Sequence, residues 1–317
     1  MKINLEEYPL ITIGTLIYNT DPRFVIEAIE AIRTNNYPNI QHIIIDDCSP
    51  DPNPKRVVKE WIEKEKYVCE FYEHEENYGI CKTLNHVLEL AKGKYICYCA
   101  DDIFLPNKLI TEVRALNDTD ESYAAAYGDA MLIDEKSNLK YGLFIQKYRS
   151  FEYLPDDEIF EILLDGNFLP AMSMMWKTDA IRDVGGYDEN LKYEDYDLHL
   201  RLFKKYKIKL IDKILSKYRI HSDSLVNNLK DWNRDLLQIY FKHRDNKIAM
   251  EKIQSIVRSV ISGSNSVAEL ERHYIRLPFF WFILKRICFL NSSFVCRNAI
   301  IYFEKLGLNL VSIVRIK

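Results

Sequence analysis

Short apolar runs alternate with amphipathic segments along about the first hundred residues. Runs rich in β-branched and aliphatic residues occupy positions 9–18, 40–45 and 68–72, and a fourth run of Tyr, Ile and Cys opens after Gly93. Between these runs, apolar residues recur at helical spacing, and the segments end at turn-forming residues. This alternation of strands and helices predicts an α/β fold with a mostly parallel central sheet and right-handed crossovers.

The rest of the chain mixes both patterns and ends in helices. Its expected elements are short strands in residues 123–144, a helix in 156–164, a strand in 208–218, and helices in 232–241, 248–261 and 294–306. We therefore expect a Rossmann-like α/β domain over residues 1–226, with a central sheet flanked by helices. A helical C-terminal extension is expected over residues 227–317.

Carboxylate pairs follow two of the predicted strands. Asp46 and Asp47 end the second apolar run, and Asp101 and Asp102 end the fourth. A parallel sheet binds its ligands just beyond the carboxyl ends of its strands, so these side chains are candidates for a binding site. A structural alternative exists for Asp101 and Asp102, because Asp is also favoured at the start of a helix, here residues 105–116.

Composition and charge fit a globular protein with a basic C-terminus. The 317 residues are 48% hydrophobic and 28% charged, with a net charge of -4. Residues 272–317 carry eight Lys or Arg and one acid, interleaved with aromatic and apolar runs. This pattern favours an anionic membrane surface over nucleic acid as a partner. The alternatives are a basic helical subdomain without a membrane role and a homo-oligomer contact through these helices.

Targeting signals and cysteines point to the cytoplasm. The N-terminus has no apolar signal segment, and the longest apolar block, residues 277–290, is interrupted by Lys285 and Arg286 and is too short for a membrane span. The seven cysteines include no CxxC pair, which is typical of free thiols in a reducing compartment, and Cys97 and Cys99 are expected in the core. The expected location is cytoplasmic, with peripheral attachment to the inner face of the cell membrane.

A series of short motifs occurs in one order along the chain. They are Tyr18-Asn19, Tyr37-Pro38-Asn39, Asp46-Asp47-Cys48-Ser49, Glu76-Asn77-Tyr78-Gly79, Asp101-Asp102, Gly185-Gly186-Tyr187-Asp188-Glu189, Glu194-Asp195 and Tyr218-Arg219-x-His221-x-x-Ser224. In this order they resemble the family 2 glycosyltransferases of the GT-A fold, over about residues 8–225.

The resemblance implies a site for a nucleoside-diphosphate sugar, with a UDP- or dTDP-linked donor. It assigns Asp47 to the pyrimidine ring, with Tyr18 and the backbone near Leu16 around the base. Lys82, within one turn of the start of its helix, would stabilise the departing diphosphate, since a helix N-terminus favours anions. The alternatives are a turn-forming role for Asp47 and a solvated position for Lys82.

The resemblance also implies a divalent metal, Mn²⁺ or Mg²⁺. Hard carboxylate oxygens suit these ions. Asp102 is the first choice as a ligand, with His221 reaching the metal or the diphosphate from the far side, and Asp101 is expected to contact the sugar or the ribose. Cys99-Ala100 stands where the family often has another acid, which is a departure from the family pattern.

Asp195 is expected to be the general base. A carboxylate near the anomeric carbon can take the proton of an acceptor hydroxyl as the new bond forms. Glu194 beside it would raise its pKa or orient the acceptor. The alternative is that Glu194, Asp195 and Asp197 only supply negative charge to the first turn of a helix.

The resulting prediction is a metal-dependent, inverting glycosyltransferase. It would move a sugar to a hydroxyl of a saccharide or a lipid-linked saccharide, in the synthesis of a bacterial polysaccharide. A nucleotidyltransferase is the alternative enzyme, although the sequence lacks the glycine-rich phosphate loop that this class would need. A catalytically silent nucleotide-sugar-binding or assembly subunit is the alternative outside catalysis.

Overall fold

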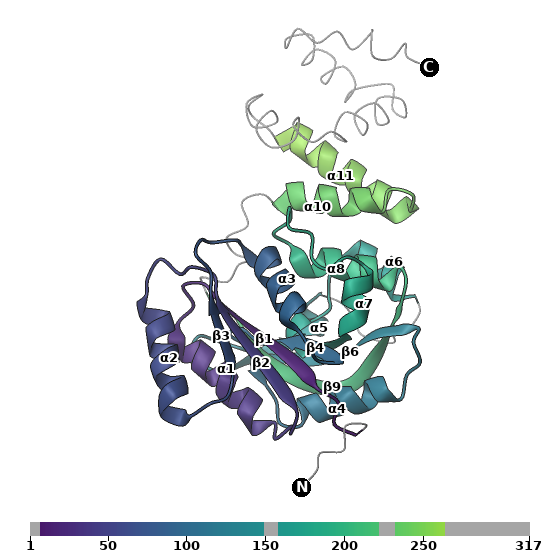
Figure 1. Cartoon of the computed structure of the whole chain (residues 1–317). Helices are drawn as coiled ribbons and strands as arrows, with labels where there is room; N and C mark the ends of the chain where they lie inside the picture. The colour runs from purple at the N-terminus through teal and green to yellow at the C-terminus, as the bar shows by residue number, and fades with distance from the viewer. Residues whose placement is uncertain (1–6, 149–157, 222–231, 264–317) are drawn as a thin grey trace, which may run out of the picture. The chain divides into compact units, whose positions relative to one another are not determined.

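The α/β fold is visible in a computed structural model of the chain (Figure 1). The structure describes residues 7–148, 158–221 and 232–263. The chain divides into two compact units, Met1–Asn228 and Leu229–Lys317. The whole sheet belongs to the first unit.

The second unit is described only in its first two helices, α10 (Trp232–Lys242) and α11 (Lys247–Gly263). These helices confirm the expected ranges to within a few residues, and they pack against each other. Ser224, the helix expected at residues 294–306 and the basic segment 272–317 lie outside the described residues. Among the helices that are described, none has both the length and the apolar character needed to cross a membrane.

The described part of the first unit forms a nine-stranded sheet in the order β3-β2-β1-β4-β8-β6-β9-β5, with β7 paired to β6. The strands are β1 (Ile11–Ile17), β2 (Ile40–Asp46), β3 (Glu70–Glu73), β4 (Tyr95–Tyr98), β5 (Ile103–Phe104), β6 (Tyr123–Ile133), β7 (Leu139–Leu143), β8 (Met174–Lys177) and β9 (Lys207–Arg219). Strands β1 to β4 are mutually parallel, and β9 is parallel to β6. The predicted α/β sheet with flanking helices is therefore confirmed, with β8 joining its two halves in antiparallel pairings.

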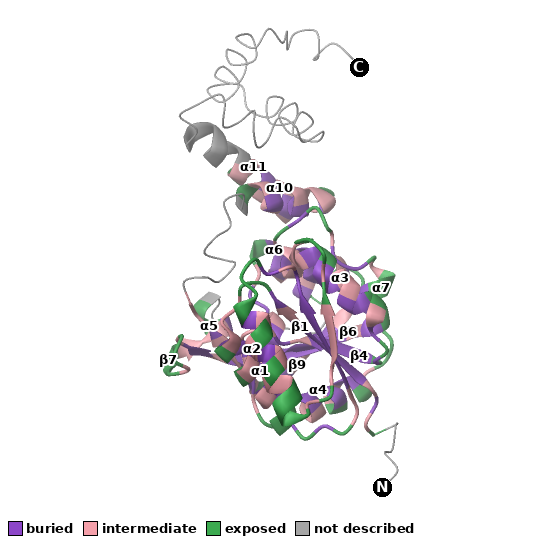
Figure 2. Ribbon diagram, turned by 60° about the vertical axis from the view of Figure 1, so that its left-hand side comes forward, coloured by how far each residue is buried: buried purple, intermediate pink, exposed green. Residues whose placement is uncertain are grey.

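Helices connect these strands and cover both faces of the sheet (Figures 1 and 2). They are α1 (Pro22–Thr34), α2 (Asn53–Glu65), α3 (Ile80–Leu90), α4 (Lys108–Asn117), α5 (Phe144–Tyr148), α6 (Ile159–Asp165), the short 3-10 helix η1 (Ala171–Ser173), α7 (Thr178–Asp183) and α8 (Glu194–Phe203). Pro22 begins α1, and Asp21 caps it by accepting a hydrogen bond from the Arg23 N–H, as the Asp-Pro pair predicts.

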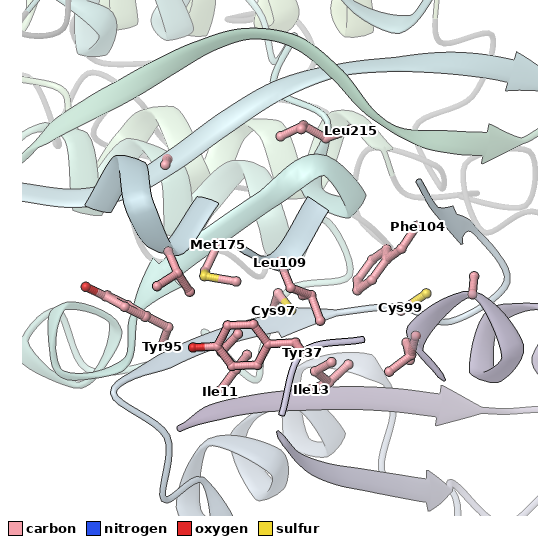
Figure 3. Close-up of a cluster of buried hydrophobic side chains, with 14 of the residues drawn as sticks. Ile11, Ile13, Tyr37, Tyr95, Cys97, Cys99, Phe104, Leu109, Met175 and Leu215 are labelled. Carbon is pink, nitrogen blue, oxygen red and sulfur yellow. The ribbon is translucent and has the colours of Figure 1, made fainter. Parts of the chain in front are cut away.

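One hydrophobic core cluster lies between the sheet and helices α1 and α4 (Figure 3). Ile11 and Tyr95 contribute from neighbouring strands, and Leu109 contributes from α4. Cys97 and Cys99 are buried in this cluster as free thiols, which confirms the packing role expected for them. Burying these residues fixes which face of the sheet packs against α1 and α4.

Helix α3 lies very close to the opposite face of the sheet. An added Cβ at Gly14 in β1 would come within 2.8 Å of the Tyr98 ring and within 2.9 Å of the Val87 side chain of α3. A larger residue would push the helix away from the strand. The glycine therefore allows α3 to pack closely against β1.

Candidate active site

The carboxyl ends of three parallel strands bring the first candidate residues to one edge of the sheet. Ile17 of β1 lies beside Asp46 of β2, and Gly14 of β1 lies beside Tyr98 of β4. Tyr18 follows β1 and is half exposed, whereas Leu16 lies within the strand. The edge expected from the sequence is therefore formed.

Asp46 holds the loop that follows β2. Its carboxylate accepts hydrogen bonds from the Ser49 hydroxyl at 2.6 Å and from the Ser49 N–H at 3.1 Å. Ser49 Oγ in turn accepts from the Asn19 N–H at 3.0 Å, which joins this loop to the end of β1. Asp46 is fully buried, and these contacts give it a structural role in the described fold.

Asp47 connects the end of β2 to the start of α3. Its Oδ1 accepts from the Tyr78 N–H at 2.9 Å, and its Oδ2 accepts from the Gly79 N–H at 2.8 Å. His74 Nδ1 lies 2.7 Å from Oδ1. Gly79 has φ +83°, a conformation that glycine adopts without strain. The carboxylate thus fixes the turn from which α3 begins.

Lys82 is exposed in the first turn of α3, with its Nζ 5.6 Å from the centre of the Tyr78 ring. Asn85 of the same helix forms hydrogen bonds with Tyr187, which follows Gly185 and Gly186. Asn85 Nδ2 donates to the Tyr187 carbonyl at 3.0 Å, and Asn85 Oδ1 accepts from the Tyr187 N–H at 2.8 Å. These bonds join the helix that carries Lys82 to the loop that leads into α8.

The structure places Asp101 and Asp102 in different environments. Asp102 is buried, and its Oδ1 accepts from the Arg219 N–H at 2.9 Å. Burial and the adjacent Asp101 charge raise the pKa of Asp102 well above its usual range. Asp101 Oδ2 lies 2.7 Å from His221 Nε2. The structure therefore brings His221 to Asp101.

Arg219 organises the region behind this pair. Its Nε donates to the Asp101 carbonyl at 2.8 Å, and its guanidinium donates to Glu27 Oε2 at 2.6 Å and to Ser137 Oγ at 3.0 Å. The guanidinium carbon also lies 4.2 Å from the centre of the Phe24 ring. The sequence motif contains Arg219, but nothing in the sequence indicates partners that lie so far from it along the chain.

Asp195 lies in the first turn of α8, partly exposed. Asn167 Nδ2 donates to its Oδ2 at 3.1 Å, and the Tyr196 N–H donates to its Oδ1 at 2.7 Å. Burial raises the pKa of Asp195 to about 6 despite these bonds. The sequence does not indicate that Asn167 pairs with Asp195, because the two residues are 28 positions apart.

The other acids of this helix have distinct surroundings. Glu194 is the first residue of α8 and is partly exposed. Asp197 is buried, and its Oδ2 forms an ion pair with Arg201 at 2.8 Å. Burial raises the pKa of Tyr187, and the charges of Glu194 and Asp195 and the neighbouring Tyr98 contribute to the shift. Tyr98 is the last residue of β4, and its ring lies 6.1 Å from the Tyr187 ring. Tyr187 therefore lies between the α8 acids, whose charges it senses, and the end of that strand.

Asp101 and His221 are the two candidate donors whose side chains the structure brings together. Within the described residues, no group of three or more His, Cys, Asp and Glu side chains is arranged to hold a metal ion. Asp101 and His221 converge from the loop after β4 and from the end of β9. Mg²⁺ and similar ions are commonly held by one or two carboxylates together with substrate phosphates. The pair therefore fits a metal site that a diphosphate completes.

Solved structures of other proteins share this fold. S. aureus TarS, residues 1–349, in complex with UDP-GlcNAc aligns with a TM-score of 0.57 at 14% identity, over 94% of this chain and 92% of that one. A mannosyltransferase from Pyrobaculum calidifontis in complex with GDP-Man and Mn²⁺ aligns with a TM-score of 0.53 at 14% identity, over 94% and 80%. At this identity the likeness shows the GT-A fold alone.

Sequence comparison identifies the family. The profile of Glycosyl transferase family 2 matches residues 12–166. An uncharacterized glycosyltransferase of Rickettsia prowazekii is 30% identical over 229 residues, 72% of this chain and 69% of that protein. One of Rickettsia typhi is 28% identical over 221 residues, 69% and 66% of the two chains. The chain therefore belongs to glycosyl transferase family 2 and is a glycosyltransferase with the GT-A fold.

Proposed function

We propose that the chain transfers a sugar from a UDP- or dTDP-linked donor to a hydroxyl of a saccharide or lipid-linked saccharide, with inversion at the anomeric carbon. The observation that carries the proposal is the position of Asp195 in the first turn of α8, where the Asn167 amide donates to its Oδ2 at 3.1 Å and burial raises its pKa. The charge of Asp195 contributes to the raised pKa of Tyr187, and the Tyr187 ring lies 6.1 Å from the ring of Tyr98, the last residue of the strand that precedes Asp101. The fold neighbours bound to UDP-GlcNAc and GDP-Man support a nucleotide-sugar donor.

In the proposed reaction, ionised Asp195 accepts the proton of the acceptor hydroxyl while the oxygen of that hydroxyl bonds to the anomeric carbon. The bond between that carbon and the diphosphate oxygen breaks, and its electron pair leaves with the diphosphate. Lys82 stabilises this charge from the start of α3, where the backbone N–H groups also favour an anion. Asp47 and Tyr18 hold the base, and Glu194 orients the acceptor.

We assign Asp101 and His221 as the residues that hold Mn²⁺ or Mg²⁺. A bound ion would neutralise the charge of the departing diphosphate. Asp102 was the ligand favoured by the sequence, and it remains a second candidate. Its Oδ1 already accepts from Arg219, so its first role in this proposal is to hold the end of β9 in place.

The donor site can be tested by thermal unfolding with UDP, UDP-GlcNAc and dTDP-glucose, each with and without Mn²⁺. A ligand at about 100 times its Kd should stabilise the chain by about 2.7 kcal/mol. Asp101→Asn should remove the Mn²⁺-dependent part of this shift. Asp179→Asn is the matched control, because Asp179 is an exposed acid at the start of α7.

A shift that Asp101→Asn leaves unchanged would contradict the metal assignment. The absence of any shift with all three nucleotides would contradict the choice of a uridine or thymidine donor. Binding without turnover, measured as release of nucleoside diphosphate, would favour the silent-subunit alternative over an enzyme.

We propose further that residues 272–317 attach the chain to an anionic membrane surface, where a lipid-linked acceptor would lie. Their excess of Lys and Arg supports this, since such segments bind anionic lipid. The full chain should sediment with phosphatidylglycerol vesicles but not with phosphatidylcholine vesicles. High salt should release it, because screening weakens exposed charge interactions. Equal recovery with both lipids, or none with either, would contradict the attachment.

A further inference from the structure

Two histidines extend the Asp47 contacts into a line of hydrogen bonds. His74 Nδ1 lies 2.7 Å from Asp47 Oδ1, and His74 Nε2 lies 2.9 Å from His86 Nδ1. The planes of the two imidazole rings are nearly parallel, at 19°, with their centres 5.1 Å apart. The side chains of His74 and Asp47 are only 6% and 7% exposed. The line joins the end of β2, the loop after β3 and helix α3.

The donor and acceptor chemistry fixes the tautomers of this line. An ionised carboxylate only accepts hydrogen bonds, so His74 Nδ1 must carry a proton in its contact with Asp47. In a neutral His74 ring, Nε2 then accepts, and His86 Nδ1 donates to it. His86 thereby determines which nitrogen of His74 carries the proton, and His74 presents an N–H to the carboxylate.

The line leaves Asp47 little freedom. A carboxylate has about four lone-pair directions. In the described structure, the Tyr78 N–H and His74 meet Oδ1, and the Gly79 N–H meets Oδ2. Both oxygens are thus fixed, with an acceptor direction of Oδ2 left for a ligand N–H. The His74 ring also packs against the Tyr78 ring at 4.8 Å, and Tyr78 lies next to Lys82.

We propose that His74 is a positioning residue for the donor nucleotide, and that His86 in turn positions His74. The inference rests on the proposed function, in which Asp47 and Lys82 contact the base and the diphosphate. His74 acts on both, because it holds the Asp47 carboxylate and supports the Tyr78 ring beside Lys82. It does not itself touch the reacting atoms, so it governs donor affinity and not the chemical step.

The test compares His74→Phe with His74→Asn in the full chain. Phe keeps the ring packing and removes the N–H, and it should weaken UDP binding about tenfold to a hundredfold, the range expected for a lost hydrogen bond to a charged group. Asn places its side-chain N–H near the position of Nδ1 and should restore most of the affinity. His86→Phe should produce a smaller loss in the same direction.

The measurement is calorimetric titration with UDP, dTDP and GDP in the presence of Mn²⁺, alongside KM and kcat for donor hydrolysis. KM should rise in His74→Phe while kcat stays nearly unchanged. Tyr72→Phe is the control, because the Tyr72 ring packs on His86 at 5.7 Å while its hydroxyl bonds to Glu70. This control should bind UDP like the wild type.

Either of two binding results would overturn the positioning role while leaving the proposed function intact: wild-type affinity in His74→Phe, or His74→Asn binding no better than His74→Phe. A fall in kcat with unchanged KM would also overturn it. If the wild-type chain binds neither UDP nor dTDP, the proposed function fails and the inference fails with it. The two failures are therefore distinguishable from the wild-type titration.

Discussion

Asp195→Asn is expected to reduce sugar transfer by about 10²- to 10⁴-fold, the usual contribution of a general base. Asn has the size of Asp but no basic oxygen, so the acceptor hydroxyl would have to lose its proton to water. The rate of diphosphate release should show this loss, and calorimetry should show unchanged UDP affinity. Asp179→Asn, the exposed acid on α7, should behave like the wild type. Undiminished turnover would remove Asp195 as the base.

The same assignment predicts how activity depends on pH. Burial raises the pKa of Asp195 to about 6, so its carboxyl group is protonated below that pH and cannot accept a proton. The value of kcat/KM should therefore fall as the pH drops through about 6 and level off above it. This direction is opposite to that of a catalytic acid, which would lose activity as the pH rises.

Asn167 offers a second test of this assignment. Its amide donates to Asp195 Oδ2 and so stabilises the ionised form, which lowers the pKa. Asn167→Leu keeps the size and removes the donor, so the acidic limb of kcat/KM should move to higher pH. Asn53→Leu, at the exposed start of α2, is the control. If the acidic limb of kcat/KM does not move in Asn167→Leu, the pH dependence does not arise from Asp195.

The strand ends were predictable because local patterns define them. An apolar run that stops at Asp47 or Asp101 indicates both a buried strand and its carboxyl end. The prediction for residues 123–144 was less accurate, since the structure has one long strand, β6, followed by one short strand, β7, where only short strands were expected. Within β6, the missing Cβ of Gly128 admits the backbone of β9, because a Cβ there would lie 2.5 Å from the Lys213 carbonyl oxygen.

Contacts between distant segments were not predictable from the sequence. Neighbouring residues at a strand end face different surroundings, so the sequence could not decide whether Asp101 or Asp102 meets His221. That choice depends on β9, because its Arg219 N–H donates to Asp102 Oδ1 and its end brings the His221 imidazole to Asp101. The partners of Asp195 and Asp47 were also not predictable from the sequence. Asn167 and His74 sit in segments without a motif, and only the fold brings them to a carboxylate.

A buried ion pair behind this site should have the largest effect on stability. On α4, Lys108 Nζ donates to both carboxylate oxygens of Glu112, at 2.9 and 2.7 Å, and both side chains are 0% exposed. The Nζ atom also lies 4.1 Å from the centre of the Phe104 ring. Phe104 belongs to β5, which follows the Asp101–Asp102 loop directly. The pair thus lies in the core that supports that loop.

Lys108→Met is expected to lower the free energy of unfolding by about 3–5 kcal/mol at neutral or higher pH, because it leaves a buried carboxylate without its partner. Burial raises the pKa of Glu112 to about 7 even with Lys108 present. Without Lys108 this pKa rises further. Since the folded variant then binds a proton that the unfolded chain releases, stability falls as the pH rises between the two pKa values. The loss should therefore be smallest in mild acid.

Urea unfolding of Lys108→Met, Glu112→Leu and the double variant isolates the charge effect. The double variant should recover most of the loss, since well-packed apolar residues can replace a buried ion pair at little cost. Lys64→Met, on the exposed face of α2, should change stability by less than about 0.5 kcal/mol. If the double variant is as unstable as Lys108→Met alone, the loss comes from packing around Phe104 and not from the unpaired carboxylate.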